Sequence, residues 1–182
     1  MLKKIISVLA ALSLALVPCL SLAEAADTAT TTEMDTESLK TIDITMDKVP
    51  EGYTYTTENA DGALYATFTC EGKPTYIVSV AYIDFFADYT LDVSELADEE
   101  LDEMIDLLGE GYDMPTISFH QTEHGTDLIV IDETDAENDY GEILTIYQGF
   151  FISCEMLSDV ELTEDDYQVA YQILSDLWPI WK

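Results

Sequence analysis

The sequence contains no arginine and only six lysines, against 38 aspartates and glutamates, so its formal net charge is −32. A surface this negative repels the phosphates of nucleic acids and the headgroups of anionic lipids. We therefore exclude nucleic acid as a partner. The same charge attracts cations and basic proteins, although it also serves the simpler purpose of keeping a protein soluble.

Long hydrophobic runs are scarce as well, and the clearest one stands at the start of the chain. Lys3 and Lys4 precede an apolar run over residues 5–17, and Ala23-Glu24-Ala25 then supplies a small-x-small cleavage site. This is the architecture of a secretory signal peptide, and the run is too short to span a membrane. We predict a signal peptide over residues 1–25 and no membrane span in the mature form.

Export implies a secreted protein that works in the extracellular space or the cell envelope. Residues 26–40 are Thr-rich and polar without an apolar period, which predicts a disordered linker, and residues 41–182 then form a single domain. Lipoprotein anchoring through Cys19 is the less favoured alternative. Pro18 directly precedes that cysteine, where such sites use a small residue.

Cysteine is also rare, with three in the whole chain and two, Cys70 and Cys154, after the predicted cleavage. An even count in an oxidising compartment permits one disulfide between them. Both cysteines lie in strand-like runs, so they are equally consistent with two buried thiols. The sequence leaves both interpretations open.

What the sequence does contain is a regular series of apolar strands and two helical patterns. A helix is predicted over residues 98–108, and a second begins at Thr163, with Asp166 in capping-box spacing, and ends before Pro179. The strands, of which the last two are joined by Gln148-Gly149, are predicted at residues 42–46, 64–70, 76–83, 115–123, 127–132, 143–147 and 150–157. The order β-β-β-α-β-β-β-β-α with short connections predicts an α+β fold, a mainly antiparallel sheet of about six to seven strands flanked by two helices.

The second helix is expected to make the largest contribution to the core. Its apolar residues follow the spacing of one helical face, and they are Tyr167, Ala170, Tyr171, Leu174, Leu177 and Trp178.

The element order, the Val49-Pro50-Glu51-Gly52-Tyr53 segment after the first strand and the closing Leu174-Ser175-Asp176-Leu177 helix resemble the PsbP-like superfamily. That superfamily includes small exported bacterial proteins and a photosystem accessory protein. The resemblance covers roughly residues 41–182 and carries no diagnostic motif, so it transfers no functional residue. It implies non-enzymatic binding or accessory work. A cystatin-like or other curved-sheet α+β fold is the alternative.

An acidic segment between two predicted strands is the most suggestive site. Ca²⁺ takes six to eight oxygen ligands, and a flexible loop dense in carboxylates can supply them. The spacing departs from the helix-loop-helix calcium motif, because Tyr140 stands where glycine is needed. The alternative is a solvated hairpin loop. The candidate Ca²⁺ ligands are Asp132, Asp135, Glu137, Asp139 and Glu142.

Catalytic signatures are lacking. The two histidines, His120 and His124, lie on a predicted strand and its turn, about 13 Å apart at the extended rise and too far for one zinc ion. No nucleophile elbow is present, so we predict that the protein is not an enzyme, with a secreted hydrolase as the least favoured alternative. The prediction is a monomeric binding or accessory module for a basic protein or cell-surface component. A Ca²⁺-binding surface domain is the second hypothesis.

Overall fold

The computed structural model describes residues 42–43, 48–60, 63–109, 112, 115–122, 126–134, 139–176 and 180–181. The predicted signal peptide (1–25) and linker (26–40) lie outside these ranges and stay predictions. Among the described residues, no helix has the length and apolar character needed to cross a membrane.

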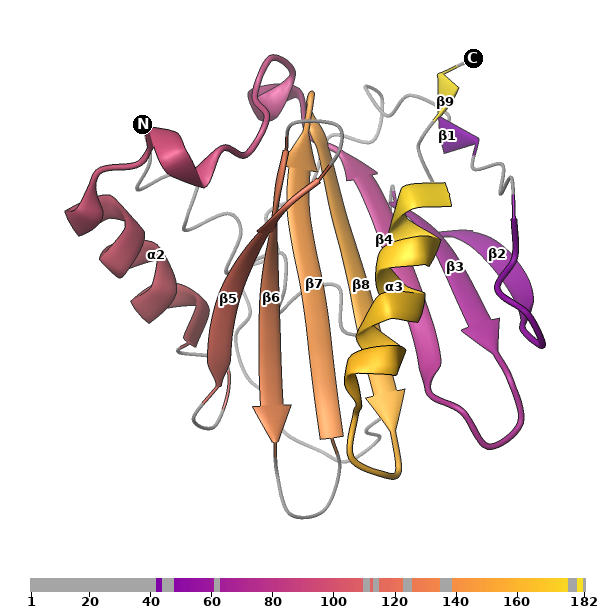
Figure 1. Cartoon of the computed structure of the whole chain (residues 1–182). Helices are drawn as coiled ribbons and strands as arrows, with labels where there is room; N and C mark the ends of the chain where they lie inside the picture. Colours follow the sequence, from indigo (N-terminus) through magenta and orange to yellow (C-terminus); the bar gives the residue numbers. More distant parts are fainter. Residues whose placement is uncertain are drawn as a thin grey trace, which may run out of the picture.

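The centre of the fold is a seven-stranded antiparallel sheet with the strand order β2-β3-β4-β8-β7-β6-β5 (Figure 1). Two α-helices, α2 (Asp98–Gly109) and α3 (Glu164–Asp176), accompany it, so the predicted α+β fold is confirmed. The strands are β2 (Thr54–Ala60), β3 (Ala63–Thr69), β4 (Thr75–Tyr82), β5 (Thr116–Gln121), β6 (Asp127–Thr134), β7 (Asp139–Tyr147) and β8 (Phe150–Ser158).

The first strand of the sheet differs from the prediction. Residues 54–60, for which no strand was predicted, form the edge strand β2 and pair with β3 over its whole length. Of the predicted first strand, the structure describes Ile42 and Asp43, which form β1 (Ile42–Asp43) and pair with β9 (Ile180–Trp181) in a separate two-stranded sheet. An edge strand has no apolar period when both of its faces meet solvent, and residues 54–59 are all exposed. Apolar alternation therefore could not reveal β2.

The predicted hairpin between β7 and β8 is confirmed. Its two turn residues have positive φ angles, 46° at Gln148 and 89° at Gly149, as a type I′ turn requires. A Cβ atom on Gly149 would lie 2.5 Å from Tyr82 Cε2 and 3.0 Å from Ala87 Cα. Glycine is therefore required there both by the backbone angle and by the space.

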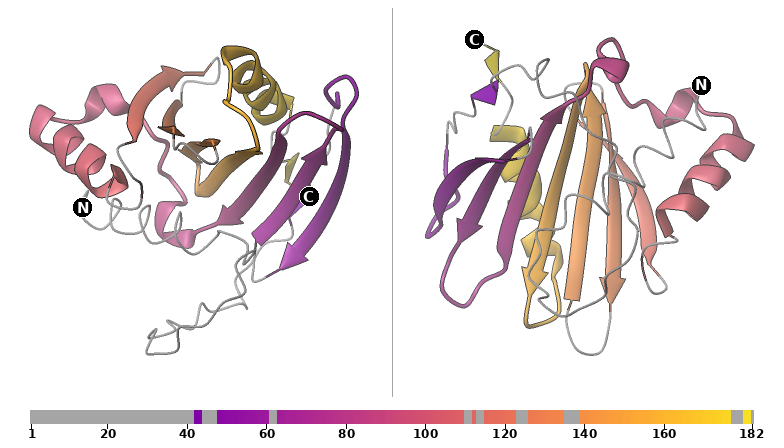
Figure 2. Two further views of the ribbon diagram at one scale, coloured as in Figure 1. Left: turned by 90° about the horizontal axis from the view of Figure 1, so that it is seen from below. Right: turned by 180° about the vertical axis from the view of Figure 1, so that it is seen from behind.

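The two faces of the curved sheet carry separate cores (Figure 2). On the concave face, α3 covers a cluster that includes Val78, Ile143 and Ile152, to which it contributes Ala170, Ile173 and Leu174. On the other face, α2 contributes Met104 and Leu108 to a second cluster with residues of β6, β7 and β8. Strand alternation sends consecutive side chains to opposite faces, which explains why the central strands are apolar on both sides.

The start of α3 forms as the sequence predicts. The backbone N–H of Thr163 donates a hydrogen bond of 2.9 Å to Asp166 Oδ2, and the Thr163 hydroxyl donates another of 2.6 Å to the same atom. The described helix ends at Asp176, so the predicted core residues Leu177 and Trp178 lie outside the described residues.

Cys70 and Cys154 are both free thiols in the structure. Cys154 is buried on β8, whereas Cys70 follows β3, and β4 lies between these two strands. Two strand spacings separate the backbones by about 10 Å, which exceeds the roughly 7 Å limit for the Cα atoms of a disulfide. The sequence left a disulfide and two thiols open, and in the structure the two cysteines are thiols.

Candidate functional site

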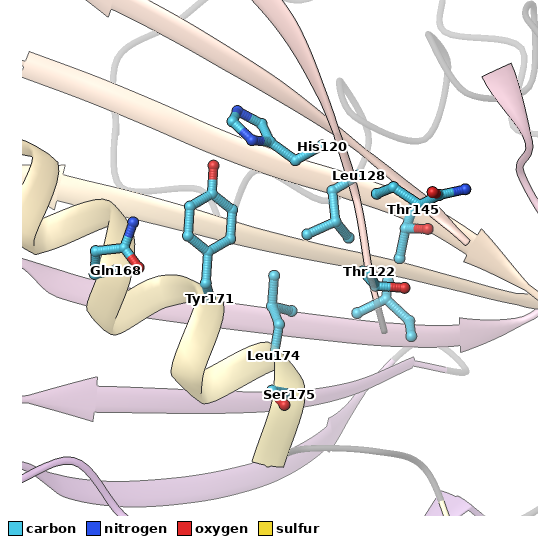
Figure 3. A pocket seen from close by; sticks show the side chains of 10 residues that line it. His120, Thr122, Leu128, Thr145, Gln168, Tyr171, Leu174 and Ser175 are labelled. Atoms are coloured by element: carbon cyan, nitrogen blue, oxygen red, sulfur yellow. The ribbon is translucent and has the colours of Figure 1, made fainter. Parts of the chain in front are cut away.

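A pocket of about 340 Å³ lies between α3 and the concave face of the sheet (Figure 3). It is built from five elements or their flanks, with α3 as one wall and β5 to β8 as the other. The lining residues are His120, Gln121, Thr122, Leu128, Thr145, Ile152, Gln168, Tyr171, Leu174 and Ser175.

The α3 wall follows from the helical repeat. Gln168, Tyr171 and Ser175 are spaced by three and four residues, so their side chains lie along one stripe of the helix. The opposite wall takes one side chain each from β6, β7 and β8, namely Leu128, Thr145 and Ile152. Because the helical stripe and the strand faces are both fixed by packing, the pocket is part of the scaffold.

The pocket has an apolar floor and a polar rim. Leu128, Ile152 and Leu174 are buried, while His120 and Gln168 are exposed. The rings of His120 and Tyr171 stand across the opening, with centroids 5.5 Å apart and planes inclined at 51°. A floor and rim of this kind suit a ligand that has an apolar body and a polar end.

The hydroxyl groups on the strand side of the pocket are already engaged. Thr145 Oγ1 donates to the carbonyl of Asp127 over 2.8 Å, and Thr122 Oγ1 donates to the carbonyl of Thr126 over 2.9 Å. The first bond joins β7 to the start of β6, and the second joins the residue after β5 to the residue before β6. Thr122 Oγ1 also accepts a hydrogen bond from the backbone N–H of Thr126 over 3.3 Å, and Thr145 Oγ1 lies 3.0 Å from Thr126 Oγ1. Both hydroxyls are therefore bonded within the protein.

Negative charge flanks the pocket at both ends of its helical wall. Gln168 Nε2 donates to Glu164 Oε1 over 2.9 Å, which holds that carboxylate at one end. Asp176 follows the lining residue Ser175 at the other end, where the helix dipole is also negative. No lysine is among the lining residues, so the local field favours a cation over an anion.

A group of buried acidic and tyrosine side chains lies on the opposite face of the sheet. Glu142 of β7 and Glu155 of β8 are directly opposed in register and are 1% and 3% exposed. The hydroxyl of Tyr112 donates to Glu142 Oε2, and that of Tyr140 donates to the same oxygen over 3.2 Å. The two tyrosine rings are stacked, with centroids 5.8 Å apart. We call these four residues the acid–tyrosine cluster.

Burial dominates the electrostatics of this cluster. It raises the pKa of Glu142 to about 7, although the hydrogen bonds from Tyr112 and Tyr140 lower that pKa in part. Burial, and after it the charge of Glu142, raises the pKa of Glu155 to about 7. Burial followed by the Glu142 charge also raises the pKa values of Tyr112 and Tyr140, so both phenols stay protonated donors at neutral pH.

The predicted Ca²⁺ ligands are only partly within the described residues. Asp135 and Glu137 lie outside them, as does the side chain of Asp139. Asp132 lies on β6, where it pairs with Gly141, so its side chain points to the sheet face opposite that of Glu142. Glu142 is not a loop residue, since it is buried in β7 with its carboxylate bonded to two tyrosines. We therefore withdraw Glu142 from the candidate set.

Among the residues that the structure describes, no group of three or more histidine, cysteine, aspartate or glutamate side chains is arranged to hold a metal ion. His120 contributes to the pocket, and His124 lies outside the described residues.

Sequence reasoning missed both the pocket and the acid–tyrosine cluster. Glu142 and Glu155 each interrupt an apolar strand. A charged residue inside an apolar strand was the sequence signal that could have identified Glu155 as a buried acid. The pocket has no such signal, because its lining comes from β5, β6, β7, β8 and α3 at once.

Comparison with known proteins finds no family model and no curated protein that matches this sequence. Among solved structures, the chain is similar to the solution structure of cyanobacterial PsbP (CyanoP) from Synechocystis sp. PCC 6803. The two are 10% identical, the match covers 86% of this chain and 95% of that one, and the TM-score is 0.37. The finding is a weak PsbP-like resemblance of fold. It carries no argument about function.

Proposed function

We propose that this protein is an exported binding module that recognises a basic protein partner. The observation that carries the proposal is the pocket beneath α3, with an apolar floor and a carboxylate at each end of its helical wall. The net charge of −32 supports it, since a field of this sign attracts cationic partners and speeds their association.

Binding is favoured over catalysis by the chemistry of the lining. A nucleophile needs a base within hydrogen-bond reach. In the described part of the chain, His120 faces the ring of Tyr171, and the hydroxyls of Thr122 and Thr145 donate to backbone carbonyls. The proposed site of action outside the cytoplasm rests on the predicted signal peptide.

The test is retention of the mature chain on an immobilised polylysine surface at increasing salt. We expect retention at low ionic strength that falls steeply as salt rises, because contacts between exposed charges are screened. A neutral surface of the same matrix is the control for adsorption. Absence of salt-dependent retention would refute the proposal.

A further inference from the structure

We propose that the pocket beneath α3 binds the side chain of a lysine that a basic partner presents. This inference rests on the proposed function, because it names the group by which the partner is recognised. It is argued from the floor, the aromatic pair and the flanking charges of the pocket.

The floor fits the stem of a lysine. Leu128, Ile152 and Leu174 are exposed by only 7%, 5% and 8%, so they offer a continuous apolar surface at the bottom of the opening. A lysine lays its four methylene groups along such a surface while its ammonium group stays near water. The volume of about 340 Å³ is at the small end for ligand pockets and leaves room for one such side chain.

The rim fits the ammonium group. The partly buried ring of Tyr171 stands at the opening beside His120 (Figure 3), and an aromatic face attracts a cation placed over it. Burial, and after it the charge of Glu164, raises the pKa of Tyr171, so the phenol is neutral and its hydroxyl is available as an acceptor. An ammonium group at the rim can thus donate a hydrogen bond to the Tyr171 hydroxyl.

The charges around the pocket select against other ligands. Glu164 and Asp176 flank the helical wall, and no lysine among the lining residues offsets them. A carboxylate or phosphate would find no cation there and would meet the negative end of the helix dipole. A neutral apolar side chain would gain binding free energy from burial against the floor, but it carries no charge to interact with the rim.

The experiment uses the mature chain and three short peptides, acetyl-Gly-Gly-Lys-Gly-Gly-amide and its forms with norleucine or acetyllysine in place of lysine. Binding is followed by the NMR shifts of the methyl groups of Leu128, Ile152 and Leu174. We expect the lysine peptide to shift these methyls and to bind more tightly than both uncharged forms. Tyr171→Ala should weaken the lysine peptide about two- to fivefold, the range of an exposed cation–π contact.

Two further variants serve as a control and as a second test of the site. Tyr55→Ala removes a part-exposed tyrosine from the remote edge strand β2 and should leave the lysine peptide unaffected. Gln168→Ala releases Glu164 from the rim at an exposed position, so it keeps the fold and should also weaken binding. Equal binding of the three peptides, or shifts confined to residues outside the pocket, would overturn the inference.

The outcome separates this inference from the proposed function. If Tyr171→Ala and Gln168→Ala leave the salt-dependent retention on polylysine unchanged, a basic partner is recognised elsewhere and the pocket inference fails alone. If the wild-type chain is not retained at all, both fail together.

Discussion

Replacing Glu142 by glutamine should remove a specific part of the pH dependence of folding stability. Glu142 is 1% exposed, and its pKa rises from 4.5 to about 7 in the folded protein. An acid with a raised folded-state pKa binds more protons when folded than when unfolded. Its stabilising contribution is therefore complete below pH 4.5 and is lost as the pH rises through about 7.

The size of the effect follows from the same two pKa values. Each tenfold change in the proton affinity corresponds to about 1.4 kcal/mol, so linkage between pH 5 and pH 8 gives a loss of about 2–3 kcal/mol that is due to Glu142 alone. Glu142→Gln keeps a carbonyl acceptor for Tyr112 and Tyr140 but cannot ionise. Between pH 5 and pH 8, the unfolding free energy of the variant should therefore rise by about 2–3 kcal/mol relative to that of the wild type.

Urea denaturation followed by circular dichroism, at constant ionic strength and several pH values, measures this difference directly. Comparing the two proteins cancels the repulsion among their many surface carboxylates, which both share. Glu58→Gln removes one negative charge at an exposed position on strand β2. The pH dependence of its unfolding free energy should therefore match that of the wild type. Parallel curves for Glu142→Gln as well would refute the buried-acid reasoning.

Three further predictions follow from the structure and the sequence. Ser79 and Ser153 share a buried hydrogen bond of 2.6 Å. Ser79→Ala alone should lower the unfolding free energy, measured by urea denaturation, by about 1–3 kcal/mol, because it leaves the buried Ser153 hydroxyl without its partner. The double alanine variant should recover part of this loss. Gly149→Ala should cost about 1–3 kcal/mol, because φ is 89° and the new Cβ meets Tyr82 and Ala87; an unchanged midpoint would contradict this turn geometry. If the acidic segment binds Ca²⁺, thermal unfolding should shift upward with Ca²⁺ but not equally with Mg²⁺, and Asp135→Asn should abolish the difference; equal small shifts would indicate charge screening alone.

Strands and helices with a strong apolar period were predictable, and those without one were not. The helix over residues 98–108 and the β7–β8 hairpin were found because their patterns coincide with the periods of helix and strand. The sequence of β2 is TYTTENA. Because this edge strand is exposed, it lacks the apolar alternation from which a strand is predicted. The sheet order places β8 between β4 and β7, a pairing across a long segment that no local pattern encodes.

The candidate sites show the same limit. A cluster of carboxylates in the sequence was interpreted as one loop, but strand pairing divides it between two faces, with Asp132 opposite Gly141 and Glu142 opposite Glu155. A shift of one position along a strand reverses the direction of a side chain. Which acids meet therefore depends on register, and register is a property of the whole sheet.

The separation of the two faces also makes the pocket and the acid–tyrosine cluster independent. Thr145 and Ile152 point toward α3, whereas Glu142 and Glu155 point to the face that carries the second cluster, although all four lie on β7 and β8. The two sites share no side chain, and substitutions without shared partners are usually additive. Glu142→Gln should thus change the pH dependence of stability and leave the affinity for the lysine peptide unaltered, while Tyr171→Ala should do the reverse. A change in both properties from either substitution would mean that the sheet transmits strain between its faces, and the pocket could then no longer be treated as a rigid site.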